Sequence, residues 1–113
     1  MQETANRRKT SRHRLNCPVR IRERGVEAAL TAILSDISLD GCYVETLQPF
    51  PMDVRLELTM ALENLEIRVH GTVCSVHPRT GMGVSFTEID AENRRRLEQI
   101  VTAQKERGVG ESF

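Results

Sequence analysis

The sequence contains few cysteines, which can cross-link a small protein, and few aromatic residues, which can stack in it. Its 113 residues include no tryptophan, one tyrosine, three phenylalanines and three cysteines. The wide spacing of Cys17, Cys42 and Cys74 argues against a disulfide framework or a zinc finger, so we expect small buried thiols in a reducing compartment. No apolar run approaches the roughly 20 residues that cross a bilayer. The polar N-terminus lacks the apolar stretch of a secretory signal, and we therefore expect a cytoplasmic protein.

The net charge is zero, but the charges are unevenly distributed. Residues 1–24 carry eight basic and two acidic side chains, a net charge of +6, and residues 25–113 carry −6. A basic arm of this kind indicates an anionic partner. Docking of the arm on its own acidic body, or a solvated tail, remain open alternatives. The proportions of hydrophobic residues (39%) and charged residues (28%) are those of one globular domain.

Alternation of apolar and polar residues dominates the chain after a polar lead. Residues 1–14 show no apolar periodicity and are expected to form a flexible arm. From there to residue 86 every second residue tends to be apolar, as in strands with one buried face. Gly71 predicts a bulge in the fifth of these strands. The expected strands are 17–22, 26–38, 41–46, 54–60, 65–77 and 82–86.

The pattern changes to that of a helix near the C-terminus. Asp90 is a suitable N-cap, and Leu97, Ile100 and Val101 form an apolar stripe at helical spacing. Gly108 is expected to take the left-handed position that ends the helix. Six strands followed by one helix predict a mainly β domain, either a small antiparallel barrel or a sandwich with the helix packed on it.

Signatures of catalysis and of metal binding are missing from the sequence. It contains no Gly-x-Ser-x-Gly elbow, no Walker loop and no His-Glu-x-x-His. The histidines at positions 13, 70 and 77 have no partner at the spacing of a metal site. We therefore expect neither an enzyme nor a metalloprotein.

Two short motifs are better candidates for binding. In "DISLDG", Asp36 and Ser38 would share one face of a strand, and a carboxylate there can accept two N–H donors from the edge of guanine. Gly41 would permit a positive φ and leave the surface open. A plain turn, in which Asp36 and Ser38 cap backbone groups, remains the alternative. In the arm, Arg8 and Arg12 form Arg-x-x-x-Arg, whose guanidinium groups suit phosphate oxygens and purine faces.

The two motifs in this order resemble the PilZ domain, a bacterial receptor module for cyclic di-GMP (c-di-GMP). "RRKTSR" and "DISLDG" carry the resemblance, and "GMGVSFTEID" is similar to the last strand of the family. The resemblance implies a six-stranded antiparallel β-barrel over residues 15–107, with a C-terminal α-helix, a flexible N-terminal arm over 1–14 and a tail over 108–113. It implies that Arg8 and Arg12 bind the phosphates and the guanine, while Asp36 and Ser38 hold a guanine from the barrel side and Gly41 keeps the surface open.

The resemblance also bears on stoichiometry and on stacking. In the family, the residue before the first motif arginine affects whether one ligand or a stacked pair binds, and Arg7 at this position favours the pair. Many family members place a bulky aromatic residue on a strand near the ligand. Here the corresponding strand offers only Ser75 and His77, so His77 is a weaker candidate contact.

The expected function is that of a c-di-GMP receptor or adaptor, whose arm orders over the ligand and creates a surface read by a separate effector protein. Two alternatives remain open. A basic arm on a small barrel also fits binding of RNA or single-stranded DNA, although the acidic body and scarce aromatics make nucleic acid an unfavourable partner. A protein-interaction module without a ligand is the second alternative.

Overall fold

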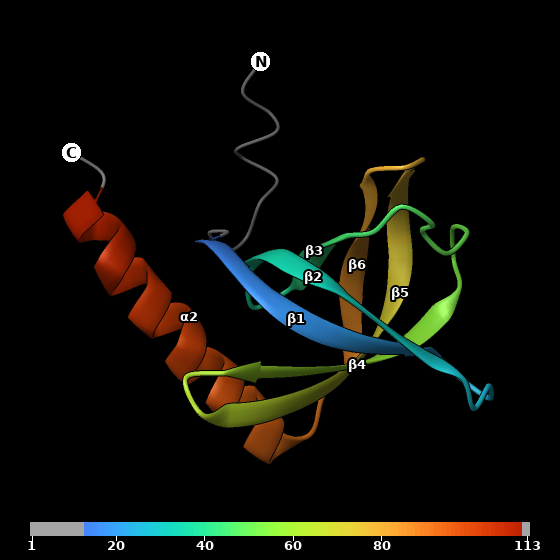
Figure 1. Ribbon diagram of the computed structural model, residues 1–113. Coiled ribbons are helices and arrows are strands. Elements are labelled where there is room, and N and C mark those ends of the chain that lie inside the picture. The colour runs from blue at the N-terminus through green and yellow to red at the C-terminus, as the bar shows by residue number, and fades with distance from the viewer. Residues whose placement is uncertain (1–12, 112–113) are drawn as a thin grey trace.

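The six strands of the structure close into a barrel (Figure 1). The computed structural model describes residues 13–111, with the side chains of residues 14–103. The strands pair antiparallel in the order β1-β2-β3-β6-β5-β4, which confirms the expected barrel followed by a helix. The elements are β1 (His13–Glu23), β2 (Ala29–Ile37), β3 (Gly41–Glu45), β4 (Arg55–Leu62), β5 (Leu65–His77), β6 (Gly81–Glu88) and α2 (Ala91–Glu111).

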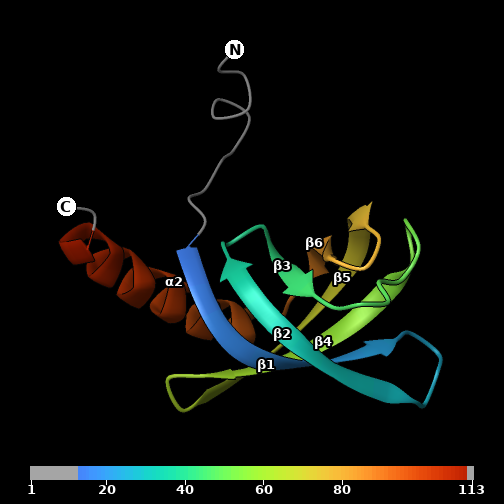
Figure 2. The ribbon, with the colours of Figure 1, turned by 45° about the horizontal axis from the view of Figure 1, so that its top comes forward.

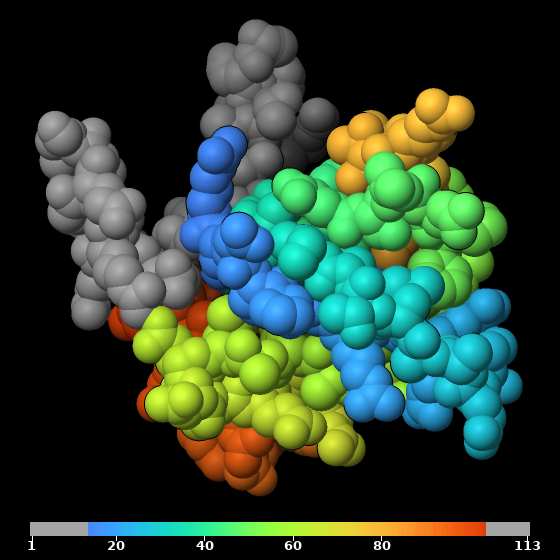
Figure 3. Space-filling model, in the orientation of Figure 1, coloured from blue at the N-terminus to red at the C-terminus, as the bar shows by residue number. Residues whose placement is uncertain are grey.

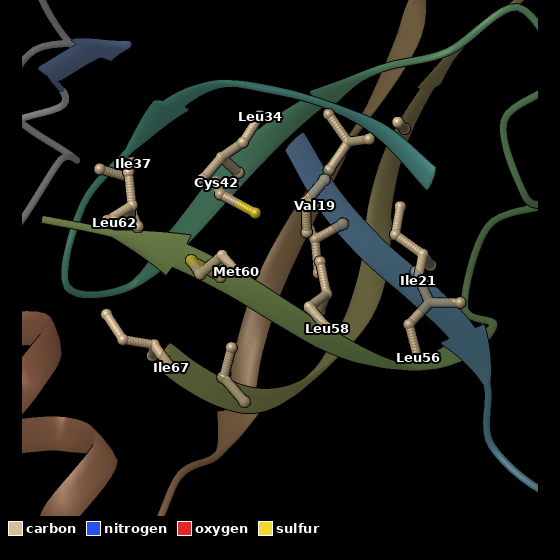
Figure 4. Close-up of a cluster of buried hydrophobic side chains, with 14 of the residues drawn as sticks. Val19, Ile21, Leu34, Ile37, Cys42, Leu56, Leu58, Met60, Leu62 and Ile67 are labelled. Atoms are coloured by element: carbon tan, nitrogen blue, oxygen red, sulfur yellow. The ribbon is translucent and has the colours of Figure 1, made fainter. Parts of the chain in front are cut away.

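The core inside the barrel consists of the inward-facing apolar residues of the alternating strands. In β4 the buried positions alternate with accessible ones from Leu56 to Leu62, as the sequence predicted. Figure 4 shows side chains from β1, β2, β3, β4 and β5 converging on the barrel axis. Burial of this apolar surface is the main stabilising contribution to the fold. The fully buried side chains include Ile21, Leu34, Cys42, Leu58 and Ile67.

The first strand and the helix extend beyond their predicted limits. β1 begins at His13 rather than at Cys17, because a bulge between Arg14 and Cys17 interrupts the alternation while pairing with β2 continues. α2 continues through Glu111, past Gly108, where the sequence predicted its end. A single glycine weakens a helix without ending it.

Two register shifts interrupt the pairing of β5 with β6. A register shift between His70 and Gly71 lies where the bulge was predicted, but its extra residue is Thr87 of β6, and the alternation of buried residues in β5 continues through Gly71. In a second shift, between Val73 and Ser75, the extra residue is Cys74 of β5, which is exposed. The expectation of three buried thiols is therefore wrong: Cys42 is buried, Cys17 is half-buried with its pKa raised by burial, and Cys74 is exposed.

The helix is fixed to the barrel by its first turns. The Asp90 carboxylate accepts the N–H of Asn93 at 2.8 Å, which confirms the predicted N-cap and lowers the pKa of Asp90. The Asn93 side-chain oxygen in turn accepts the backbone N–H of Arg68 in β5 at 2.8 Å. Leu97 and Ile100 are buried where α2 contacts β5 and β1. The C-terminal half of α2 runs away from the barrel in both views (Figures 1 and 2). Within the described residues, no helix has the length and apolar character needed to span a membrane.

We expect Leu97→Ala to lower the free energy of unfolding by about 2–4 kcal/mol, because it leaves a cavity between helix and barrel. Urea denaturation followed by circular dichroism measures the change. Thr102→Ala, on an exposed position of the same helix, is the control and should leave the unfolding midpoint nearly unchanged. A Leu97→Ala protein as stable as the wild type would show that α2 is not part of the cooperative core.

Candidate functional site

Ser38 forms the turn that joins β2 to β3. The hydroxyl is only 2% exposed and accepts the backbone N–H groups of Asp40 at 3.2 Å and Gly41 at 3.3 Å. It donates to the Gly41 carbonyl at 3.3 Å, and the Ser38 N–H donates to the same carbonyl at 2.9 Å. The turn interpretation left open by the sequence is therefore correct for Ser38. Its expected place on one strand face with Asp36 is wrong, because β2 ends at Ile37 and the chain then turns inward.

Gly41 is required by the close approach of two strands. A Cβ at this position would lie 2.3 Å from the carbonyl oxygen of Val84 in β6, the neighbouring strand. The expected positive φ at Gly41 is wrong: among the described residues, Gly25 is the only glycine with a positive φ. Gly41 is also buried, so it acts by letting β3 and β6 pair rather than by clearing the outer surface.

Asp36 lies on the outer surface of the barrel, in line with residues from four other strands. A bulge between Leu34 and Asp36 brings Asp36 into register with Tyr43, whose neighbours in β3 are buried. Such bulges redirect side chains beside functional sites. The first outward row runs across β1, β2, β3, β6 and β5 through Arg14, Asp36, Tyr43, Gly83 and Ser75. The row beside it runs through Pro18, Ile33, Glu45, Gly81 and His77.

A hollow of about 570 Å³ lies at the β1–β2–β3 end of these rows. Two carboxylates, Asp36 and Glu45, and the guanidinium of Arg14 provide its charge. Arg14 was missed by sequence analysis because β1 was expected to start three residues later, so its pairing with Asp36 could not be foreseen. The lining residues are Arg14, Leu15, Asn16, Ile33, Ser35, Asp36 and Glu45.

Tyr43, in the middle of the first row, contacts His77, which ends the second row at β5. The Tyr43 hydroxyl lies 2.9 Å from His77 Nδ1, and the ring centroids are 5.8 Å apart with an interplanar angle of 40°. Desolvation, together with the carboxylates of Glu45 and Asp36, raises the pKa of Tyr43. Tyr43 was also missed, although its outward position in a predicted strand was a usable signal. The structure places the weaker candidate, His77, beside it.

A larger hollow of about 960 Å³ lies elsewhere, between β4, β5 and the start of α2. Its charged side chains pair with one another: Arg22 bonds Glu57, and His70 lies 3.6 Å from Glu57 and 3.2 Å from Glu88. The Arg22 hydrogen bond lowers the pKa of Glu57. Of the motif residues that the structure describes, Asp36 lines the smaller hollow and none lines this one, so we assign the functional surface to the wall around Asp36.

The arginines Arg7, Arg8 and Arg12 lie outside the described residues, so their position relative to Asp36 is not part of the site geometry. Between residues 14 and 103, the structure contains no group of three or more His, Cys, Asp or Glu side chains that could hold a metal ion.

Solved structures with this fold include PilZ domains. The PilZ domain of YcgR from Escherichia coli with c-di-GMP has a TM-score of 0.75 at 16% identity, covering 94% of this chain and 97% of that one. The inhibitor of motility MotI/DgrA of Bacillus subtilis has a TM-score of 0.75 at 18% identity, covering 87% and 51%. The MrkH–c-di-GMP complex of K. pneumonia has a TM-score of 0.69 at 22% identity, covering 85% and 50%.

Although these pairwise identities are low, a match to a family model extends over most of the chain. The chain spans about half the length of MotI/DgrA and MrkH, and no curated protein sequence matches it. A family model described as "PilZ domain" matches residues 6–103, a range that includes both sequence motifs. The chain therefore belongs to the PilZ domain family.

Proposed function

We propose that the chain is a receptor for c-di-GMP and binds it on the wall around Asp36. The observation that carries this proposal is the position of Asp36 in a PilZ-family chain: it is on the outer surface, beside a hollow of about 570 Å³ and opposite Arg14. Relatives of the same fold, the YcgR domain and MrkH, have been solved with c-di-GMP. In this proposal the chain has no enzymatic step and works in the cytoplasm.

Asp36 recognises the guanine base. Its ionised carboxylate accepts hydrogen bonds only, and guanine presents two adjacent N–H donors, at N1 and N2, to such a group. Adenine presents no matching pair of donors at this edge. The carboxylate of Asp36 therefore supplies selectivity for guanine rather than affinity for phosphate.

The arm supplies the charge that the wall lacks. Asp36 and Glu45 repel an anionic ligand unless cations accompany it. Strand β1 begins at His13, so Arg12 directly precedes it in the sequence. Arg14, the second residue of the strand, lies opposite Asp36. Arg8 is four residues further, a distance of at most about 14 Å in an extended chain. Both motif arginines can therefore reach the ligand phosphates and order the arm over the ligand.

Ser38 and Gly41 support the site without contacting the ligand. The Ser38 hydroxyl is buried and committed to the turn, and Gly41 is buried between β3 and β6. Their role is to fix the end of β2, and with it Asp36, against β3. This assignment replaces the direct contacts expected from the resemblance.

In this proposal the arm determines how many ligands bind and which surface an effector recognises. A stacked pair of ligands brings four phosphate charges together, and Arg7 adds the cation that favours this pair. The entropic cost of ordering about ten residues of the arm offsets much of the free energy gained from charge-assisted hydrogen bonds. We therefore expect a dissociation constant in the micromolar range, which corresponds to a binding free energy of about −8 kcal/mol. The arm and ligand together form a new surface, which a separate effector protein reads.

We expect Arg8→Ala and Arg12→Ala each to weaken c-di-GMP binding by about tenfold or more, because each removes charge-assisted hydrogen bonds to the ligand. Isothermal titration calorimetry of the full chain measures affinity and gives the stoichiometry in the same experiment. Arg95→Ala, on the exposed side of α2, is the matched control. Wild-type affinity in both arm variants would refute the role of the arm. Salt-dependent binding of oligonucleotides of any sequence, with no binding of c-di-GMP, would favour the nucleic-acid alternative.

Asp36→Ala should reduce the preference of the protein for c-di-GMP over cyclic di-AMP, because the alanine no longer accepts the guanine donors. Calorimetric titration of wild type and variant with both nucleotides measures this ratio. Glu45→Ala removes the neighbouring carboxylate of the same hollow and serves as the control. A wild-type protein that binds both nucleotides equally would contradict the assigned role of Asp36.

Ser38→Ala is expected to lower the free energy of unfolding by about 1–3 kcal/mol, since two backbone N–H groups lose their buried acceptor. Ser35→Ala should cost less, because the Ser35 hydroxyl is only half-buried and makes one hydrogen bond of 3.4 Å. Urea denaturation of the two variants compares them directly. If both variants were as stable as the wild type, the hydroxyl of Ser38 would not be what holds the turn.

A further inference from the structure

We propose that Tyr43 and His77 together form the aromatic surface on which a guanine base of the ligand lies. The inference rests on the proposed function and assigns a binding role to a residue outside both sequence motifs. It also gives His77 a defined partner. The chain lacks a tryptophan, and this pair of smaller rings provides the stacking area instead.

The two rings meet across a strand that carries no side chain between them. Tyr43 belongs to β3 and His77 to β5, and β6 runs between these strands. Tyr43 pairs with Gly83, but its ring leans diagonally over Gly81, which pairs with His77. A Cβ at Gly81 would lie 2.7 Å from Tyr43 Cε2 and 3.0 Å from its hydroxyl oxygen. The glycine therefore leaves the space in which the tyrosine ring rests.

The β6 strand is covered in the same way one pair further along. Ser75 of β5 accepts the N–H of Gly83 through its hydroxyl at 3.1 Å, and a Cβ at Gly83 would lie 2.5 Å from that oxygen. Both outward positions of β6 in this region are thus glycines overlaid by side chains of the neighbouring strands. The result is a low surface made of one phenol ring, one imidazole ring and one hydroxyl.

The position of this surface relative to Asp36 fits a single purine. Asp36 and Tyr43 are directly paired across β2 and β3, and side chains at such positions have Cβ atoms about 5 Å apart. The effect of Asp36 on the pKa of Tyr43 is a second sign that the carboxylate is close to the phenol. A base whose N–H edge is held by Asp36 therefore extends over the Tyr43 ring.

The bond between the two rings prepares them for stacking. The 2.9 Å contact between the Tyr43 hydroxyl and His77 Nδ1 holds the phenol against β6 before any ligand arrives. Side chains that are already ordered lose little conformational entropy on binding. Stacking on aromatic side chains is a general source of affinity for nucleic-acid bases because every base has a π face.

The sequence offers a direct spectroscopic test of this proposal. Tyr43 is the one tyrosine of a chain without tryptophan, so intrinsic tyrosine emission reports this ring alone. Titration of the full chain with c-di-GMP should quench the emission with the affinity measured by calorimetry. A free tyrosine derivative at the same nucleotide concentrations corrects for absorption by the ligand. Emission that stays constant while calorimetry shows saturation would overturn the proposal.

Variants separate stacking from a purely structural bond. Tyr43→Phe keeps the ring and loses the bond to His77, so its affinity should stay within about threefold of the wild type. Tyr43→Leu keeps an apolar cover over Gly81 but loses the aromatic face, and its affinity should fall about tenfold or more. Thermal melts confirm that both variants fold. Equal affinities of the Phe and Leu variants would overturn the proposal.

The histidine half of the pair is tested against another histidine of the same strand. His77→Ala should weaken c-di-GMP binding several-fold. His70→Ala, which removes a ring that contacts Glu57 and Glu88 at the other hollow, should leave the affinity unchanged. A wild-type chain that fails to bind c-di-GMP at all would overturn the proposed function itself. Binding that is normal in the wild type, Tyr43→Leu and His77→Ala proteins would overturn only the assignment of the aromatic surface.

Discussion

The close pairing of β3 with β6 is the constraint on which the rest of the structure depends. These strands are far apart in the sequence, and their pairing closes the barrel together with that of β1 and β4. It requires glycine on both sides, because a Cβ at Gly41 would meet the Val84 carbonyl and a Cβ at Gly81 would meet the Val44 carbonyl, each at 2.3 Å. Carbonyl oxygens at this distance cannot rotate away as a side chain does. The same pairing turns Val44 and Val84 into the core and places Gly81 and Gly83 on the outside, so this strip of β6 has no side chains of its own and is overlaid by Tyr43 and Ser75.

In the proposed binding mode, a flat ligand rests on that strip. Asp36 comes to its edge through the β2 bulge, and the Ser38 turn fixes the end of β2 against β3. The β3–β4 loop and the β5–β6 turn lie side by side above the barrel (Figure 3), joined by a hydrogen bond from the Thr46 N–H to the Thr80 carbonyl at 3.2 Å. The residues of the "DISLDG" motif thus have different structural roles. Asp36 presents a charge to the surface, while Ser38 and Gly41 hold the backbone that positions it.

The fold could be predicted from the sequence because alternation is a local property. The inward face of β4 and the Asp90 cap depend on neighbours within a few residues, and the structure confirms both. The contribution of Arg14 and the contact of Tyr43 with His77 could not be predicted in the same way, although the outward position of Tyr43 could. Arg14 becomes relevant only through its register with Asp36, and Tyr43 only through its diagonal reach to His77, 34 residues away. The role of Gly41 also depends on a residue far away in the sequence, because the carbonyl that excludes a side chain there belongs to β6. The sequence therefore suggested a different role for this glycine.

A closed barrel also limits how binding can be signalled. Each described strand is paired on both sides, so no strand has a free edge and no alternative register that a ligand could select. Strand β5 carries Ser75 and His77 on the outer wall and is joined to the helix by the hydrogen bond between Arg68 and Asn93. If the chain binds c-di-GMP as proposed, the change must therefore arise outside the barrel, in the arm that precedes His13. An effector would then recognise the covered wall itself, rather than a rearranged domain, and specificity for the bound state would come from arm and nucleotide together.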